Sequence, residues 1–262
     1  MKTVLVVVAV LVLFAAGASA GSIGSAVQVS IVTDSGRTLP LYPTAARAMV
    51  RKAYAEAIKG ENYRIVVRNN LDRRVGVVVA VDGRNIISGQ KSWLGNSERM
   101  YIIDPQATGE YNGWRTGQDQ VNRFYFTEVA DSYAAAFKDE STMGVIAVAV
   151  YPEVRRCEPR VLQEEAGPAA PAPARANEKS SAAGTAALAA ADTAGTGYGR
   201  SEYSPSYRVE FDPEPAPHET IYLKYEWRST LCRLGFVSCD VPRRAANRLW
   251  DDGGYAPPPP RR

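Results

Sequence analysis

The alternation of apolar and polar residues along the chain predicts a protein built mainly of short β-strands. The clearest example is Val75–Ser88, where two apolar runs flank Asp82-Gly83. A two-residue hairpin turn needs positive φ angles at both central positions, and aspartate and glycine tolerate these best. This stretch therefore predicts a β-hairpin. The other predicted strands are Val27–Thr33, Tyr63–Asn69, Arg99–Ile103, Val121–Val129, Met143–Tyr151, Tyr207–Phe211 and Thr220–Glu226.

Three segments refine this pattern. Met143–Tyr151 is apolar at successive positions and rich in β-branched residues, which predicts a central strand that is covered on both faces. Ser229–Leu234 is expected to form a short helical or turn segment. Lys52–Ile58 is ambiguous, because its composition suits a helix that ends at Gly60 as well as a strand that pairs with its neighbour across a turn.

These elements predict an all-β fold, an antiparallel β-sandwich of jelly-roll-like type with little helix. An Ala/Pro-rich stretch interrupts the pattern and has too few large apolar residues to offset its ordering entropy, so we expect a disordered internal insertion there. The expected organisation is a leader at 1–20, an N-terminal extension at 21–51, sandwich segments at 52–163 and 195–240, the insertion at 164–194 and a Pro-rich tail at 241–262.

The N-terminus has the three parts of a secretory signal peptide. Lys2 supplies the positive charge, Val4–Phe14 is an apolar stretch too short to span a bilayer, and Ala18–Ala20 forms an A-x-A cleavage site. We therefore expect an exported protein, in the periplasm or at the cell surface. No later stretch is apolar enough for a transmembrane helix, so none is expected after cleavage.

The charge and the cysteines set further limits. Loss of Lys2 with the leader lowers the formal net charge from +3 to +2, which is too small a bias to indicate nucleic-acid binding. In an oxidising compartment, Cys232 and Cys239 could close a small loop through a disulfide, although Cys157 could pair with either of them. The single histidine, His218, and the absence of a CxxC motif speak against a metal site, and we expect no cofactor.

A series of short motifs resembles a family of uncharacterised exported proteins of Gram-negative bacteria. In order, they are VDGRN at 81–85, GWR at 113–115, FYF at 124–126, DSYA at 131–134, GVI at 144–146 and GTGYG at 195–199. The resemblance spans roughly 54–236, and it implies an architecture and a compartment but no activity. Because a strand precedes the first turn in that pattern, the resemblance also favours a strand at 52–58.

Evidence for catalysis is weak in this sequence. There is no G-x-S-x-G motif to accompany His218, and the glycine-rich run at 195–199 lacks the lysine and hydroxyl residue of a phosphate-binding loop. Two carboxylates, such as Asp82 with Glu110 or Asp131, could act as acid and base, but their spacing does not bring them together. Asp82 is also explained by its position in the turn.

The polar and aromatic residues near strand ends are better candidates for a site, because function tends to lie on loops held by a rigid scaffold. The candidate ligand-binding residues are Asn85, Trp114, Arg115, Asp131 and Tyr133. The alternative is structural: Trp114 closes one end of the sandwich, and Arg115 pairs with Asp131 or Glu110. The leading hypothesis is a non-catalytic module of the cell envelope that binds protein or glycan through this loop face. The second is an envelope hydrolase that uses carboxylates on the same face.

Overall fold

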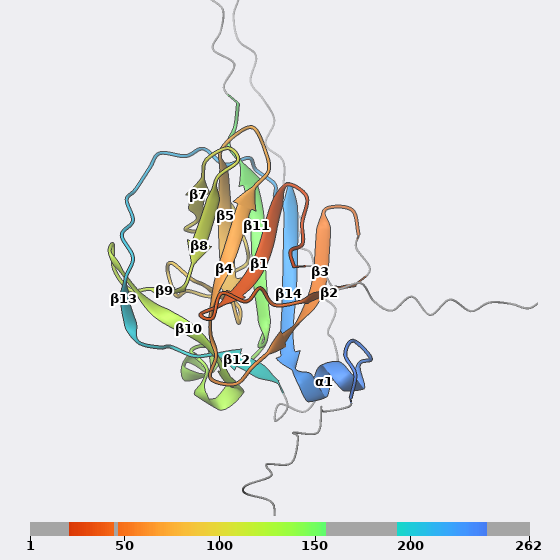
Figure 1. The fold of residues 1–262 in the computed structure, drawn as a ribbon. Coiled ribbons are helices and arrows are strands. Elements are labelled where there is room, and N and C mark those ends of the chain that lie inside the picture. Colours follow the sequence, from red (N-terminus) through yellow and green to blue (C-terminus); the bar gives the residue numbers. More distant parts are fainter. Residues whose placement is uncertain (1–20, 45–46, 156–192, 240–262) are drawn as a thin grey trace, which may run out of the picture.

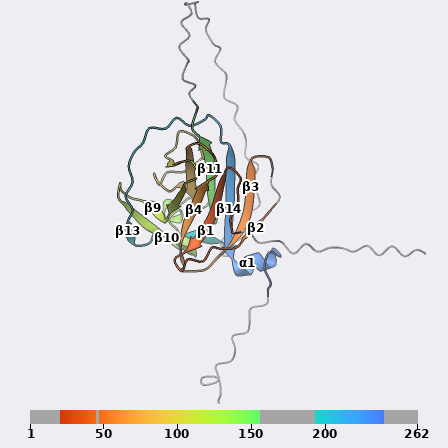
Figure 2. The same ribbon diagram turned by 45° about the horizontal axis from the view of Figure 1, so that its top comes forward.

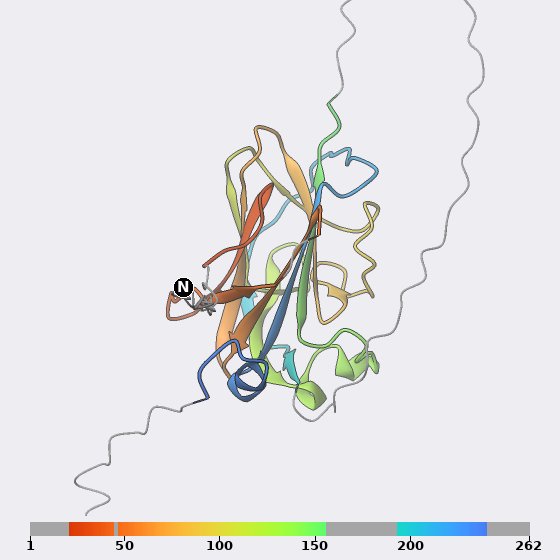
Figure 3. The ribbon, with the colours of Figure 1, turned by 90° about the vertical axis from the view of Figure 1, so that its right-hand side faces the viewer.

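The computed structural model describes residues 21–44, 47–155 and 193–239 of the chain. They form two β-sheets that pack face to face around one apolar core, as the edge-on view in Figure 3 shows. Each sheet has seven strands, and the longer strands of the two sheets run in roughly the same direction (Figure 1). The predicted all-β sandwich is therefore confirmed.

Sheet 1 has β1, β4, β10 and β12 in that order, and shorter strands pair alongside β4 and β10. All of its strand pairs are antiparallel. Its strands are β1 (Val27–Thr33), β4 (Asn62–Asn69), β8 (Thr108–Tyr111), β9 (Gly113–Arg115), β10 (Gln120–Glu128), β12 (Ala194–Thr196) and β13 (Ser201–Tyr203).

Sheet 2 has the order β2-β3-β14-β11-β5-β6, and β7 pairs with β5. The pair β3–β14 is parallel, and the other pairs are antiparallel. In Figures 1 and 2, β2 and β3 lie at one side of the molecule and β13 at the other. The strands are β2 (Leu41–Pro43), β3 (Val50–Ala57), β5 (Val75–Val81), β6 (Arg84–Asn85), β7 (Tyr101–Ile103), β11 (Val145–Pro152) and β14 (Glu219–Trp227).

The strands with the strongest sequence patterns lie in the centre of sheet 2. β11 pairs with β14 on one side and β5 on the other, and it is buried on both faces, as the uninterrupted apolar pattern predicts. β5 is fully buried and leads into the Asp82-Gly83 turn, where the φ angles are 48° and 78°. Both angles have the sign that a type I′ turn requires.

One segment that the sequence left open and one that it placed outside the domain are both assigned by their strand partners. The ambiguous stretch at 52–58 forms most of β3, a strand held between β2 and β14. The stretch at 21–51, expected as an extension before the domain, instead supplies β1 and β2 to the two sheets. Val27, Val29 and Ile31 of β1 are completely buried, so this segment is part of the sandwich.

The end of the described chain partly follows the prediction. A short helix, α1 (Arg228–Arg233), follows β14, and Cys232 and Cys239 form a disulfide with a Cα–Cα distance of 5.0 Å. The strand predicted at Tyr207–Phe211 is absent from the structure, because this stretch pairs with neither sheet and runs along the outside as an extended segment. The expected insertion and Pro-rich tail, together with Cys157, lie almost wholly outside the described residues.

Candidate functional site

A cavity of about 430 Å³ lies where β9 and β10 of sheet 1 approach the loop after β6 of sheet 2. Two 3₁₀ turns, η1 (Val129–Asp131) and η2 (Ala135–Phe137), form another wall, and the segment after β12 closes the ring. Its lining combines aromatic and polar residues in equal number with three small or aliphatic ones: Ile86, Ser88, Gly89, Trp114, Arg115, Thr116, Tyr125, Asp131, Ser132, Tyr133, Ala136, Phe137 and Tyr198. Four of the five candidate residues from the sequence therefore meet here.

Tyr133 is the centre of the aromatic cluster. Its ring centroid lies 4.3 Å from that of Trp114, 5.0 Å from Phe137 and 5.4 Å from Tyr198. The rings of Tyr133 and Tyr198 are nearly parallel, whereas Phe137 meets Tyr133 edge-on. Gly89 has a φ of +68°, and a Cβ there would lie 2.8 Å from the Tyr133 hydroxyl. Glycine at this position thus lets the loop approach the ring.

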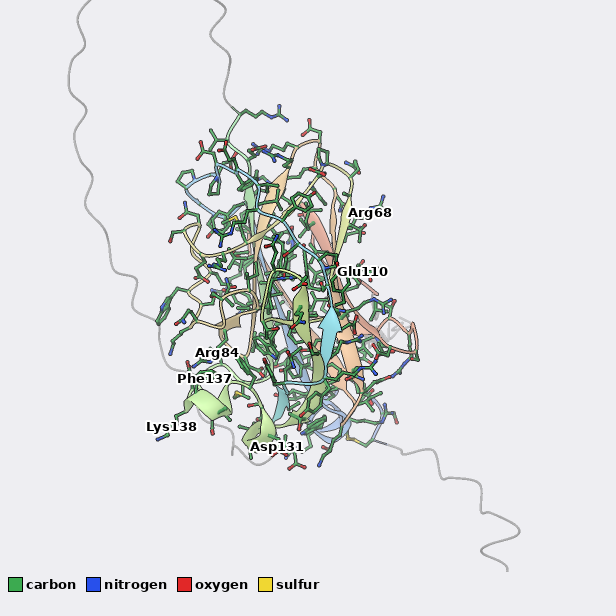
Figure 4. All side chains as sticks on the ribbon, turned by 90° about the vertical axis from the view of Figure 1, so that its left-hand side faces the viewer. Arg68, Arg84, Glu110, Asp131, Phe137 and Lys138 are labelled. Atoms are coloured by element: carbon green, nitrogen blue, oxygen red, sulfur yellow. A yellow bond between two sulfur atoms is a disulfide. The ribbon has the colours of Figure 1, made fainter. Side chains whose placement is uncertain are left out.

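The exposed part of the cluster is formed by residues that the sequence did not single out. Phe137 is 52% exposed and Tyr198 is 46% exposed, so both rings offer apolar surface to solvent at the cavity mouth. The guanidinium carbon of Arg84 lies 3.9 Å from the centroid of the Phe137 ring, so the two side chains form a cation–π contact. Figure 4 shows Arg84, Phe137 and Lys138 close together, and Asp131 at the lower end of the same side.

Trp114 lines the deep end of the cavity and belongs to the core. Its side chain is 2% exposed, and its ring meets Phe124 edge-on with centroids 5.3 Å apart. The indole Nε1 donates a hydrogen bond of 3.1 Å to the carbonyl of Gly197. A buried tryptophan with its N–H satisfied supports the wall of the site, while a ligand would meet mainly the rings in front of it.

Arg115 forms neither of the ion pairs considered from the sequence. Its Nε donates to the Tyr101 hydroxyl at 2.8 Å, and its terminal nitrogens donate to three backbone carbonyls and to the Ser204 hydroxyl. Glu110 pairs instead with Arg64 at 3.0 Å. The guanidinium of Arg115 is therefore occupied in fastening the loop beyond β9 to the segment around Ser204.

Asn85 is a buried structural residue and does not line the cavity. Its Oδ1 accepts hydrogen bonds from the backbone N–H groups of Ile87 and Ser88. Its Nδ2 donates to the carbonyl of Arg99 and to the carboxylate of Glu98. All of these contacts lie within or beside one loop, so the amide shapes the loop that follows the hairpin.

The turn residue Asp82 has a second role that the sequence did not reveal. Its carboxylate is completely buried and accepts hydrogen bonds from the Tyr225 hydroxyl at 2.6 Å and from the backbone N–H groups of Gly144 and Thr196. The Thr196 hydroxyl in turn contacts the hydroxyls of Tyr225 and Tyr63 at 2.7 and 2.6 Å. This series of hydrogen bonds joins the two sheets.

Burial raises the pKa of Asp82 to about 6, although its hydrogen bonds from Tyr225, Thr196 and Gly144 favour the charged form. Its neighbours are protein groups on all sides, and it has no access to the cavity. Among the described residues that line the cavity, Asp131 is the one carboxylate. No second acid thus faces Asp131 across the cavity.

Searches for related proteins add no assignment: no family model, no curated protein and no solved structure matches the chain. Within the described residues, no helix is both long and apolar enough to cross a membrane. The same residues contain no group of three or more histidine, cysteine or acidic side chains placed to hold a metal ion.

Proposed function

We propose that this protein is a non-catalytic, exported module of the bacterial cell envelope that binds glycan in the aromatic cavity. The observation that carries the proposal is the convergence of Tyr133, Phe137 and Tyr198 on one cavity, with two of the three rings about half exposed. Apolar surface at a cavity mouth is a common feature of binding sites in soluble proteins.

The chemistry of the lining favours a glycan over other small ligands. The faces of aromatic rings can stack on the apolar face of a pyranose, and the hydroxyls of Tyr198 and Ser88 can exchange hydrogen bonds with sugar hydroxyls. Among the described residues that line the cavity, Arg115 is the one cation, and its guanidinium is already hydrogen-bonded to Tyr101 and Ser204, so it is not free to bind an anion.

Export is supported by the sequence of the first twenty residues, with a basic start, an apolar stretch and an A-x-A site before Gly21. The resemblance to exported proteins of Gram-negative bacteria agrees with this compartment.

An envelope hydrolase is the less favoured function. A glycosidase that uses two carboxylates needs them to face one another across the bond that is cleaved. Asp131 has no such counterpart in the lining, and Asp82, whose pKa is raised by burial, is enclosed between the sheets. The arrangement therefore supports binding more than catalysis.

The binding site is tested most simply at Tyr198, whose ring is exposed and is not part of the core. The matched control is Tyr207→Ala, which removes an 83% exposed tyrosine from the extended segment outside the sheets. Binding of β-1,4-linked N-acetylglucosamine oligomers would be measured by calorimetry for the processed chain and both variants.

We expect Tyr198→Ala to weaken binding about fivefold, because one stacked aromatic ring contributes on the order of 1 kcal/mol. Tyr207→Ala should bind like the unmodified chain. Equal affinity of Tyr198→Ala and the unmodified chain, with both folded, would contradict the proposed site. Binding of envelope protein with no glycan binding would contradict the proposed ligand class.

A further inference from the structure

Trp93 is the most exposed tryptophan of the described residues, with 81% of its surface accessible. It lies in the loop between β6 and β7, which packs over the outer face of sheet 2. Exposure of such a large apolar side chain is unfavourable, and tryptophan is the residue type most enriched among binding hot spots.

This loop is rigid because Glu98 gathers its backbone around one carboxylate. That carboxylate accepts four hydrogen bonds: from the Ser92 hydroxyl at 2.7 Å, the N–H groups of Trp93 and Gly95 at 2.8 and 3.0 Å, and the Asn85 amide at 3.2 Å. Partial burial alone would raise the pKa of Glu98, but these donors lower it below its usual value. The backbone N–H of Trp93 is one of these donors, so the Glu98 carboxylate fixes the backbone of the tryptophan directly.

The residue after Trp93 anchors the loop to sheet 2. Leu94 packs against the cluster of Val78, Ala149 and Tyr151, and its carbonyl accepts a hydrogen bond of 2.5 Å from the Tyr151 hydroxyl. Leu94 adopts a φ of +60°, a backbone conformation that is unfavourable for leucine. Its side chain thus points inward and is anchored, while the neighbouring indole is presented to solvent.

A continuous series of contacts links Trp93 to the aromatic cavity. The Lys91 ammonium lies 5.5 Å from the Trp93 ring centroid and 3.2 Å from the Asp139 carboxylate, beyond η2. The backbones of Lys91 and Arg84 form a β-bridge, and Arg84 packs on Phe137 at the cavity mouth. In Figure 3, the loop after β6 and the 3₁₀ turns lie on the same side of the molecule.

We propose that Trp93 is a second stacking platform for the same ligand, and that this ligand is a glycan polymer long enough to reach from the cavity to Trp93. This inference rests on the proposed function and adds the class of glycan, an extended chain as opposed to a single sugar. A rigid loop suits this role, because little conformational entropy is lost when a ligand binds to it.

The charges around Trp93 favour a neutral polymer over an anionic lipid surface. Lys91 is paired with Asp139, and the guanidinium of Arg84 is buried against Phe137. Attraction to an anionic membrane needs several free cations near the surface. With Lys91 ion-paired and Arg84 buried, the exposed Lys138 beside Phe137 does not make a basic patch by itself, so the aromatic faces are the main source of affinity.

The experiment varies the length of the oligomer and the exposed aromatic residue that is removed. Affinities for β-1,4-linked N-acetylglucosamine oligomers of one to six units would be measured for the unmodified processed chain, Trp93→Ala, Tyr198→Ala and the control Tyr207→Ala. Protection of the exposed indole from acrylamide quenching provides a second signal, with Trp93→Phe as the reference that lacks it. Vesicles of phosphatidylglycerol form a parallel arm.

The unmodified chain should bind the longest oligomers at least tenfold more tightly than the disaccharide, and these oligomers should shield Trp93 from the quencher. Trp93→Ala should lose this gain with length and keep its affinity for the disaccharide, whereas Tyr198→Ala should weaken for every length. Equal gains with length in Trp93→Ala and the unmodified chain would overturn the second platform and leave the cavity intact. Absence of glycan binding by the unmodified chain, or Trp93-dependent binding to vesicles alone, would overturn both proposals.

Discussion

At the residue scale, Asp82 combines two structural demands. Its positive φ suits the hairpin turn, and between the sheets its carboxylate accepts hydrogen bonds from the Tyr225 hydroxyl and two backbone N–H groups. Hydrogen bonding of a buried acid avoids the larger cost of an unsatisfied polar group, but it does not remove the cost of burying the charge. The raised pKa of Asp82 expresses that remaining cost.

This residue makes stability depend on pH. Because the pKa of Asp82 is about 6 in the folded protein and 3.8 in an ordinary aspartate, the folded state retains a proton between these values that the unfolded state has lost. The Asp82 contribution to the free energy of unfolding should thus be greatest below pH 4 and fall by about 3 kcal/mol as the pH rises through 6.

The measurement is the difference in unfolding free energy between the unmodified chain and Asp82→Asn, followed by urea denaturation from pH 4 to pH 7. The variant loses an acceptor for the Thr196 N–H, which gives a constant offset, and only the pH dependence of the difference is diagnostic. A difference that stays constant across this range would show that Asp82 does not titrate there.

Two tryptophans offer a matched pair for stability. Trp114→Ala should lower the free energy of unfolding by about 3–5 kcal/mol, because it leaves a cavity in the core and removes the hydrogen bond to Gly197. Trp93→Ala should change it by less than about 0.5 kcal/mol, since that ring is exposed. Urea denaturation of both variants checks this, and similar losses would contradict the assignment of Trp114 to the core and Trp93 to the surface.

At the scale of the elements, the local sequence predicted those strands whose burial gives them a clear pattern of apolar residues. β5, β11 and β14 follow this rule, because apolar residues and turn residues mark their extent. β3 did not, since its alanines and charged residues suit a helix equally well, and its parallel pairing with β14 decides the outcome. The stretch at 207–211 alternates like a strand, yet it has no sheet edge to join.

Helix α1 gives a prediction at this scale. Leu231 is the buried residue of the helix, and the disulfide joins Cys232 of the helix to Cys239 beyond it. Reduction should lower the local stability of this segment by about 2 kcal/mol, by the loop-closure entropy that the crosslink removes from the open state. Hydrogen exchange at the amides of Leu234 and Phe236 should then accelerate roughly thirtyfold.

The amides of β11 are the internal control for this experiment, because they lie in the middle of sheet 2, away from the disulfide. They should exchange at the same rate with and without reductant. Unchanged exchange at Leu234 and Phe236 would show that the disulfide does not stabilise the end of the described chain, whereas faster exchange throughout would show that it supports the entire sandwich.

At the scale of the whole molecule, the N-terminal segment completes both sheets. Glu219 of β14 is buried and accepts hydrogen bonds from the backbone N–H groups of Ser25 and Ala26. After these residues the chain enters β1, which pairs with β4. A chain that begins at Asp34 would expose the core that Val27, Val29 and Ile31 cover. Each of these residues contributes on the order of 1.5–3 kcal/mol, so the shortened chain should not fold.

A chain that begins at Ile23 is the matched control and should keep the β-sheet circular dichroism and the cooperative unfolding of the chain that begins at Gly21. Cooperative unfolding of the chain that begins at Asp34 would show that 21–33 is an extension outside the domain after all. The sequence could not distinguish these possibilities, because the strand pattern of β1 was visible but its partner, β4, was not.

The candidate site was predictable in part, for a reason that also belongs to this scale. Loop position and residue type named Trp114, Arg115, Asp131 and Tyr133 as one group, and these four line one cavity, while their binding of a ligand stays a prediction. Their individual roles depend on neighbours from distant segments, such as Gly197 and Ser204, which sequence alone does not place. Phe137, Tyr198 and Trp93 were missed, because an exposed aromatic residue is recognisable only when its surroundings are known.

The most direct test of the account is to map the ligand surface by nuclear magnetic resonance. A hexamer of β-1,4-linked N-acetylglucosamine would be titrated into the chain that begins at Gly21, with backbone and indole signals assigned. We predict that the shifts concentrate at Tyr133, Phe137 and Tyr198 and at the indole of Trp93. Shifts that concentrate instead on the outer face of sheet 1, around Arg68 and Glu110 on the other side of Figure 4, or no shifts at all, would contradict it.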